Sequence, residues 1–194
     1  ILNKYGDRIT IGCHGLTHRS WSAWPEDSAG FSIALNKATE IIKQNVGKNW
    51  RPWFRAPGGY IAPWMAKVIA KSGYTVDSSI NPSWLVRKKA GKGNNWKKVR
   101  ESIVDSKIIE REWLNKWGLP VNGPALSLFP LSIIAKTAWR KIPPILSVTQ
   151  ALSAPENPSF NIDTIYWHIL DHGRKNGNGS PPIPSSRFSL NINR

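Results

Sequence analysis

The stretch RITIGCHGLTHRS, residues 8–20, joins a β-strand pattern to two histidines that lie four positions apart. Polar and apolar residues alternate in RITIGC (8–13), which is typical of a strand and places His14 at or just past its C-terminal end. If the following loop curls into a helical turn, His18 can turn its ring to the same side as His14. The spacing alone leaves two interpretations open, a pair of metal ligands or two histidines satisfied near a strand end.

The residues after this stretch alternate between helix and strand patterns. From about Asp27, apolar residues recur at helical spacing until Gly47, which is typical of a helix end. A strand pattern over 50–60, a helix over 62–73 and a strand over 74–80 follow. The order β-α-β-α-β predicts a parallel sheet or barrel, in which functional residues gather at the carboxyl ends of the strands.

Beyond residue 81 the patterns are looser. The sequence predicts a loop over 81–95, a strand over 107–112, a helix over 129–142 and a last strand over 161–170 that carries His168. We expect one domain over residues 1–175, followed by an irregular tail rich in Gly, Pro and Ser over 176–194.

The composition limits the possible partners. The formal net charge of +15 makes a polyanion such as nucleic acid, an anionic glycan or a membrane surface worth considering. The basic run VRKKAGKGNNWKKVR (86–100) fits either a solvated loop or a nucleic-acid contact. The single cysteine, Cys13, excludes an internal disulfide and a multi-cysteine zinc site. No run is long and apolar enough for a membrane helix, so we expect a soluble chain, cytoplasmic or in the cell envelope.

A second motif follows the next predicted strand. In RPWFRAPGGY (51–60), Arg55 is followed by Pro57 and Gly59. A strand with His-x-x-x-His, then a helix, then a strand with Arg-x-Pro-x-Gly resembles the polysaccharide deacetylases, the NodB-like carbohydrate esterases of family four. The run YTVDSSI (74–80) and the segments IIEREW (108–113) and LPVNGPALSLFPL (119–131) resemble the subgroup encoded at exopolysaccharide loci.

The resemblance implies a distorted (β/α) barrel that removes acetyl groups from N-acetylhexosamine units of a polysaccharide. It implies that His14 and His18 hold a divalent metal, most often zinc, together with an aspartate. Arg55 would orient an aspartate that acts as the general base. The backbone N–H of Gly58, where the family often has tyrosine, would donate to the oxyanion.

Further roles follow from the same resemblance. His168, in IYWHILDHG (165–173), matches the histidine that acts as general acid, and His172 is the alternative. Asp77 would be the partner of that acid, or it caps a turn at the strand end. Tyr60 and Trp84 would line the substrate, although both also fit simple packing roles.

One part of the family pattern is absent. Two adjacent aspartates, the base and the third metal ligand, belong to a strand ahead of the histidine strand, and this chain contains no Asp-Asp pair. We therefore expect the chain to be the C-terminal part of a longer deacetylase, with the N-terminal strand of the barrel missing. The alternatives are an inactive glycan-binding or scaffold module on the same fold, and a basic nucleic-acid-binding protein.

Overall fold

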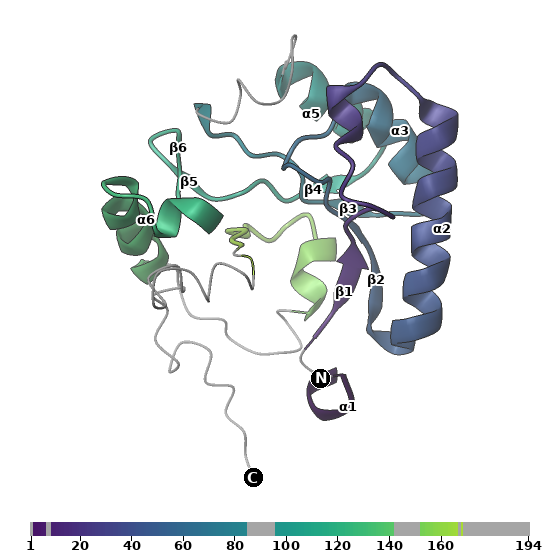
Figure 1. The fold of residues 1–194 in the computed structure, drawn as a ribbon, viewed down its shortest axis with the longest axis horizontal. Helices are drawn as coiled ribbons and strands as arrows, with labels where there is room; N and C mark the ends of the chain where they lie inside the picture. The colour runs from purple at the N-terminus through teal and green to yellow at the C-terminus, as the bar shows by residue number, and fades with distance from the viewer. Residues whose placement is uncertain (1, 7–8, 85–95, 142–151, 167, 169–194) are drawn as a thin grey trace.

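A parallel β-sheet forms the centre of the protein (Figure 1). The computed structural model describes residues 2–6, 9–84, 96–141, 152–166 and 168. The sheet has the order β1-β2-β3-β4, and all three pairings are parallel. Its strands are β1 (Ile11–Cys13), β2 (Trp50–Phe54), β3 (Val76–Asp77) and β4 (Ile109–Glu110). The alternation of strands and helices predicted for the first eighty residues is therefore confirmed.

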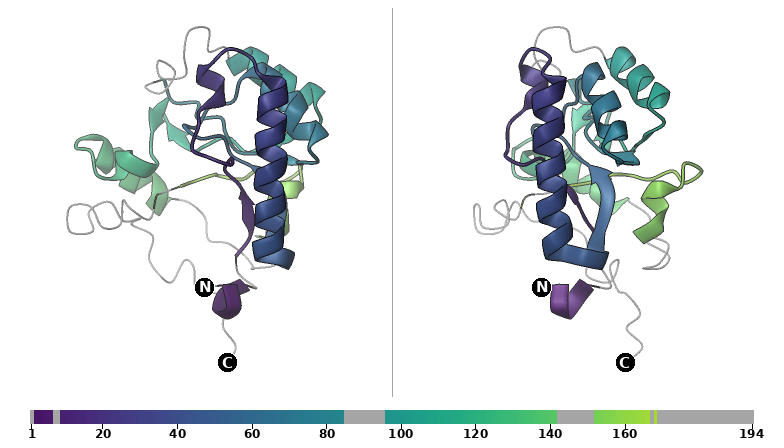
Figure 2. Two further views of the ribbon diagram at one scale, coloured as in Figure 1. Left: turned by 45° about the vertical axis from the view of Figure 1, so that its right-hand side comes forward. Right: turned by 90° about the vertical axis from the view of Figure 1, so that its right-hand side faces the viewer.

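Three helices pack in a row against this sheet: α2 (Ser28–Val46), α3 (Pro63–Lys71) and α5 (Trp96–Asp105) (Figure 2). Helix α2 begins where predicted, because the Asp27 carboxylate accepts a hydrogen bond from the backbone N–H of Gly30 at 2.8 Å. It ends at Gly47, whose φ of +50° favours glycine. Pro63 occupies the first turn of α3, where its missing N–H costs nothing.

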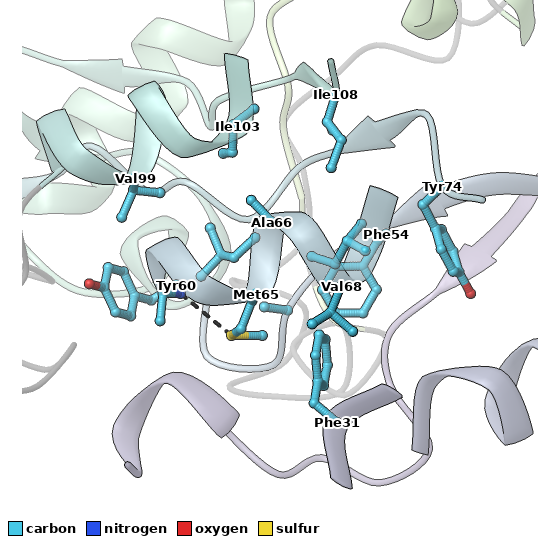
Figure 3. Close-up of a cluster of buried hydrophobic side chains, with 14 of the residues drawn as sticks. Phe31, Phe54, Tyr60, Met65, Ala66, Val68, Tyr74, Val99, Ile103 and Ile108 are labelled. Atoms are coloured by element: carbon cyan, nitrogen blue, oxygen red, sulfur yellow. Dashed lines mark hydrogen bonds between the residues drawn. The ribbon is translucent and has the colours of Figure 1, made fainter. Parts of the chain in front are cut away.

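An aromatic cluster joins α2, α3 and the sheet (Figure 3). The ring of Phe31 on α2 lies 5.9 Å from that of Phe54 on β2 and 5.7 Å from that of Trp64 on α3, measured between centroids. Trp21 lies 5.6 Å away on the other side of Phe31. These tilted and edge-to-face contacts are the arrangement that aromatic rings prefer. Phe31 is therefore the side chain around which this part of the core is built.

A smaller unit covers the other side of the molecule (Figure 1). Strands β5 (Asn115–Lys116) and β6 (Leu119–Pro120) form an antiparallel hairpin, and α6 (Leu131–Arg140) packs against it. The buried indole of Trp139 donates to the backbone oxygen of Val121 at 2.7 Å. The remaining short elements are α1 (Leu2–Tyr5), η2 (Trp21–Ala23), η3 (Gly47–Asn49), η4 (Gly123–Leu126) and η5 (Ala154–Glu156).

The predicted last strand over 161–170 is wrong for residues 161–166, which are described as a largely irregular segment. Thr164 forms one isolated parallel bridge with Trp113. The backbone of this segment bonds to two separate parts of the chain. The backbone oxygen of Thr164 accepts from Leu114 N, and that of Tyr166 accepts from Gly123 N. A regular strand needs one continuous neighbour. The predicted tail, 176–194, lies outside the described residues, and closure of the sheet into a barrel stays a prediction.

The solvated loop expected for the basic run 86–100 is wrong for residues 96–100, the part of the run that the structure describes. Residues 96–100 begin α5, because Trp96, Val99 and Ile103 form a buried face at helical spacing. Lys97 lies 3.9 Å from Glu101, and Arg100 binds Glu112 through two nitrogens. These two cations are thus paired within the protein. Among the described residues, no helix combines the length and apolar character needed to cross a membrane.

The Phe31 cluster leads to a stability prediction. Replacing Phe31 with Ala should lower the free energy of unfolding by about 3–5 kcal/mol, since it removes a buried ring from contact with three others. Ile33 lies on the same helix but is 70% exposed, so Ile33→Ala should change the free energy of unfolding by less than about 0.5 kcal/mol. Urea denaturation measures both. Equal losses would contradict the assignment of Phe31 to the core.

Candidate active site

His14 and His18 lie close together beyond the end of β1. Their ring centroids are 5.2 Å apart, and the rings are inclined by 70°. The Nδ1 of His14 is 2.8 Å from the backbone oxygen of Arg55, so this nitrogen carries the proton and donates it. The Nε2 of His14 is then the unprotonated nitrogen. Metal-binding histidines are held by the same kind of bond to a carbonyl.

The electrostatic surroundings of His14 favour its neutral form. Partial desolvation lowers the pKa of His14, and the hydrogen bond to the Arg55 oxygen opposes this. The positive charges of His18, Arg55 and His168 lower the same pKa further. Neutral imidazole is the form that binds a metal. Within the described ranges, no group of three or more His, Cys, Asp or Glu side chains could hold a metal ion.

Arg55 contacts the histidine side of the site through its backbone and the β3 side through its side chain. Its Nε donates to the backbone oxygen of Ser78 at 3.1 Å, and its Nη2 donates to the Ser78 hydroxyl at 3.0 Å. The guanidinium also lies 5.4 Å from the ring centroid of Trp113 and 5.8 Å from that of Tyr166. Burial lowers the pKa of Arg55, while the nearby Asp77 raises it.

The turn Asp77–Ser79 connects the ends of three strands. The Ser79 hydroxyl donates to Asp77 Oδ1 at 2.6 Å and accepts from Ala56 N at 2.8 Å. The Ser78 hydroxyl donates to the backbone oxygen of Arg111 at 2.9 Å. One serine therefore ties β3 to the turn after β2, and the other ties it to the residue after β4. Every one of these bonds is short enough to be a normal hydrogen bond.

Trp113 explains why a glycine ends the arginine motif. Its indole donates to the backbone oxygen of Ser78 at 2.7 Å, and its ring lies against Gly59. A Cβ atom added to Gly59 would lie 2.3 Å from Cη2 of Trp113, and the φ of Gly59 is +68°. Both the close approach and the left-handed backbone require glycine. The tryptophan that forms this wall is not part of the predicted set of site residues.

Gly58 has an available backbone N–H at the same turn. Its φ is +80°, it is exposed, and no hydrogen-bond acceptor for its N–H is present among the described residues. An added Cβ would come within 3.1 Å of the Ser20 hydroxyl. A free N–H at an exposed turn is what a donor to a substrate oxygen requires. The position therefore remains suitable for the predicted oxyanion donor.

His168 lies in the neighbourhood of His14. Its exposed ring packs edge-on against Tyr166, with 5.4 Å between centroids, and Tyr166 packs on Trp113 at 4.3 Å. His168 is also one of the charges that lower the pKa of His14. The structure thus brings His168 to the same end of the sheet as His14 and Arg55. The alternative acid, His172, lies outside the described residues.

Three other predicted site residues have different surroundings. Asp77 is fully buried and accepts two hydrogen bonds from Ser79, which agrees with the predicted alternative that it caps a turn at the strand end. Tyr60 is 7% exposed and packs on Trp96, so it belongs to the core and offers no face to a sugar (Figure 3). Trp84 is 51% exposed, and its backbone N–H donates to the Gly118 oxygen at 3.0 Å. Trp117, which the sequence reasoning missed, directly precedes Gly118 in the chain and is 75% exposed.

Part of the chain matches a known protein family. Residues 2–76 match the model of the polysaccharide deacetylase family. The matched region contains His14, His18 and Arg55, and it ends just before Asp77. The resemblance expected from the motifs is confirmed over this region, which supports a hydrolase that deacetylates polysaccharides. Comparisons with curated proteins and with solved structures give no match.

The contact between Gly59 and Trp113 leads to a prediction with an internal control. Gly73→Ala should lower the free energy of unfolding by about 1 kcal/mol, because the φ of Gly73 is +82° but nothing lies within 4 Å of an added Cβ. Gly59→Ala should cost at least about 2 kcal/mol more, because Trp113 must also move. Thermal unfolding of both variants measures the difference. Equal costs would show that Trp113 does not pack on Gly59.

Proposed function

We propose that this chain carries part of the active site of a metal-dependent deacetylase that hydrolyses the acetamide groups of N-acetylhexosamine units in a polysaccharide. The observation that carries the proposal is the 2.8 Å hydrogen bond between His14 Nδ1 and the Arg55 backbone oxygen. It joins the two motifs on which the resemblance rests, and both lie in the region that matches the polysaccharide deacetylase family.

His14 and His18 would hold the metal, most suitably zinc, through ring nitrogens. Imidazole nitrogen is a preferred zinc ligand, and the bond from His14 to a carbonyl fixes the tautomer that leaves Nε2 available. A bound divalent metal supplies a Lewis acid, which polarises the amide carbonyl and lowers the pKa of water towards about 7. Two protein ligands satisfy only part of the tetrahedral shell that zinc prefers.

The other groups have roles that follow from their chemistry. His168 would donate a proton to the leaving amine nitrogen, since a histidine can be protonated near neutral pH. The exposed N–H of Gly58 would donate to the carbonyl oxygen as negative charge develops on it. Arg55 would orient a carboxylate base, because its planar guanidinium offers several donors in fixed directions. Asp77 would act indirectly, through Ser79 and the turn that follows Arg55.

Trp84 would provide an apolar face for a sugar ring, because about half of its surface is exposed. Trp117 is close to it in the fold, since the Trp84 backbone N–H bonds to Gly118. Two exposed tryptophans would also suit a glycan-binding module without catalytic activity, which is the second candidate. A full-length protein that still lacks the Asp-Asp motif, and that binds an N-acetylhexosamine oligomer without releasing acetate, would favour that candidate.

The first test is metal binding, measured by titration with zinc chloride. The wild-type chain should bind zinc weakly, because two ligands compete poorly with water. His14→Ala and His18→Ala should each abolish this binding, whereas His168→Ala should leave it unchanged and so serves as the control. Zinc binding that is equal in all four proteins would contradict the assignment of the ligands.

The second test separates the general acid from the metal ligands. In a form of the protein that also carries the Asp-Asp strand, and with an N-acetylhexosamine oligomer as substrate, His168→Ala should reduce the rate of acetate release by about a hundredfold or more. Its zinc affinity should stay at the wild-type value. His172→Ala is the matched control and should retain most of the rate. An unchanged rate in His168→Ala, together with a loss in His172→Ala, would transfer the role to His172.

A further inference from the structure

Two acidic side chains lie side by side at the ends of β3 and β4. Asp77 and Glu110 are the last residues of these strands and are direct partners in the parallel register. Register partners on neighbouring strands present their side chains to the same face of a sheet. Asp77 is 0% exposed, and Oε2 of Glu110 is also buried. Two carboxyl groups therefore lie together at this edge of the sheet, one fully buried and the other with one buried oxygen.

The hydrogen bonds of the pair are incomplete if both groups are ionised. Both oxygens of Asp77 accept hydrogen bonds from Ser79. Glu110 Oε1 accepts from the backbone N–H of Ile80 at 3.2 Å, but its Oε2 has no hydrogen-bond donor among the described residues. A buried oxygen without a donor is costly. One proton shared between the two carboxyl groups, which are register partners on neighbouring strands, would give this oxygen a hydrogen-bond partner.

The charges around the pair favour a single shared proton. The cation that faces both acids is Arg55, whose own hydrogen bonds go to Ser78. The other ionisable groups that act on the three residues are His14, Glu112, Arg100 and the phenol of Tyr166, and Arg100 is already bonded to Glu112. Two carboxylates would leave one negative charge in excess. One proton makes the group of Asp77, Glu110 and Arg55 neutral.

We propose that Asp77 and Glu110 share one proton in the folded protein and together act as the single negative counter-charge that keeps Arg55 in place, so that Glu110 is a positioning residue of the site. This inference goes beyond the proposed function and does not depend on it, because it concerns a charge balance in the folded chain. The mechanical link runs through the turn at Ser78 and Ser79, whose hydroxyls bond Arg55 and Asp77 respectively.

The acid–base behaviour of the pair agrees with this arrangement. Burial raises the pKa of Asp77, and burial together with the charge of Asp77 raises the pKa of Glu110 well above its usual range. Above about pH 4.3, the ordinary value for glutamate, the pair then binds more protons in the folded protein than in the unfolded chain. The contribution of the pair to stability therefore falls as the pH rises from there through the folded-state pKa, whereas His14, whose pKa is lowered, contributes in the opposite direction near pH 6.5.

The test compares urea unfolding of three proteins between about pH 5 and about pH 9. In the wild type, the unfolding equilibrium constant should rise by up to about tenfold per pH unit between about pH 5 and the folded-state pKa of the pair. Glu110→Gln should remove most of this rise, because an amide mimics the protonated carboxyl and can donate to Asp77. Glu40→Gln is the control, because Glu40 is exposed on α2 and its charge does not act on the pair, so this variant should keep the wild-type slope. Identical slopes in the wild type and Glu110→Gln would overturn the proposal.

A second measurement on the wild type guards against a variant that fails to fold. Carbon-13 NMR of the side-chain carboxyl groups should show one Asp or Glu that stays protonated above about pH 5, where exposed carboxyl groups are ionised. The nitrogen-15 signal of Arg55 Nε should shift at the pH where that proton is lost, which a purely structural pair would not cause. Titration of all twelve acidic side chains below about pH 5 would refute the shared proton. Neither measurement requires a metal or a substrate.

Discussion

The turn Asp77–Ser79 is the constraint on which the candidate site depends. Ser78 holds the guanidinium of Arg55, Ser79 holds the backbone after Arg55, and Asp77 holds Ser79. Since β3 is only two residues long, these side-chain bonds, rather than a long ladder, fix the ends of β2, β3 and β4 to one another. The position of Arg55 in turn fixes His14, whose ring is held by the Arg55 backbone oxygen. His14, which follows β1, is thus connected through Arg55 and Ser78 to the residue after β4.

The first half of the fold could be predicted because its signals are local. The N-cap at Asp27, the glycine at 47 and the apolar spacing between them define α2 without any tertiary information. Prediction was less successful where structure depends on distant partners. Residues 96–100 look like a solvated basic loop, and only the packing of Trp96 and Val99 against the core makes them helical. The segment 161–166 looks like a strand, yet its bonds go to Leu114 and Gly123 in turn.

In the candidate site too, residues marked by local motifs could be predicted, and residues placed by packing could not. His14, His18 and Arg55 could be found from short motifs at the ends of predicted strands, and the structure brings them together. Trp113 and Glu110 lie in the quoted segment IIEREW, but the resemblance assigned no role to either, although Glu110 ends β4 and the rule on strand ends could have indicated it. Tyr60 was assigned to the substrate on its position next to the motif, but the chain turns it into the core. Which way a side chain points after a glycine turn is set by packing and is not readable from spacing.

The central claim is that the bond between the two motifs prepares His14 to bind a metal together with His18. Anomalous X-ray diffraction at the zinc absorption edge, from crystals of the chain soaked in zinc chloride, tests it most directly. The account predicts an anomalous peak within about 2.0–2.1 Å of His14 Nε2 and of one ring nitrogen of His18, with Nδ1 of His14 still bonded to the Arg55 oxygen. A zinc peak elsewhere with none at this pair, or zinc bound to Nδ1 of His14 after the bond to Arg55 has broken, would contradict it.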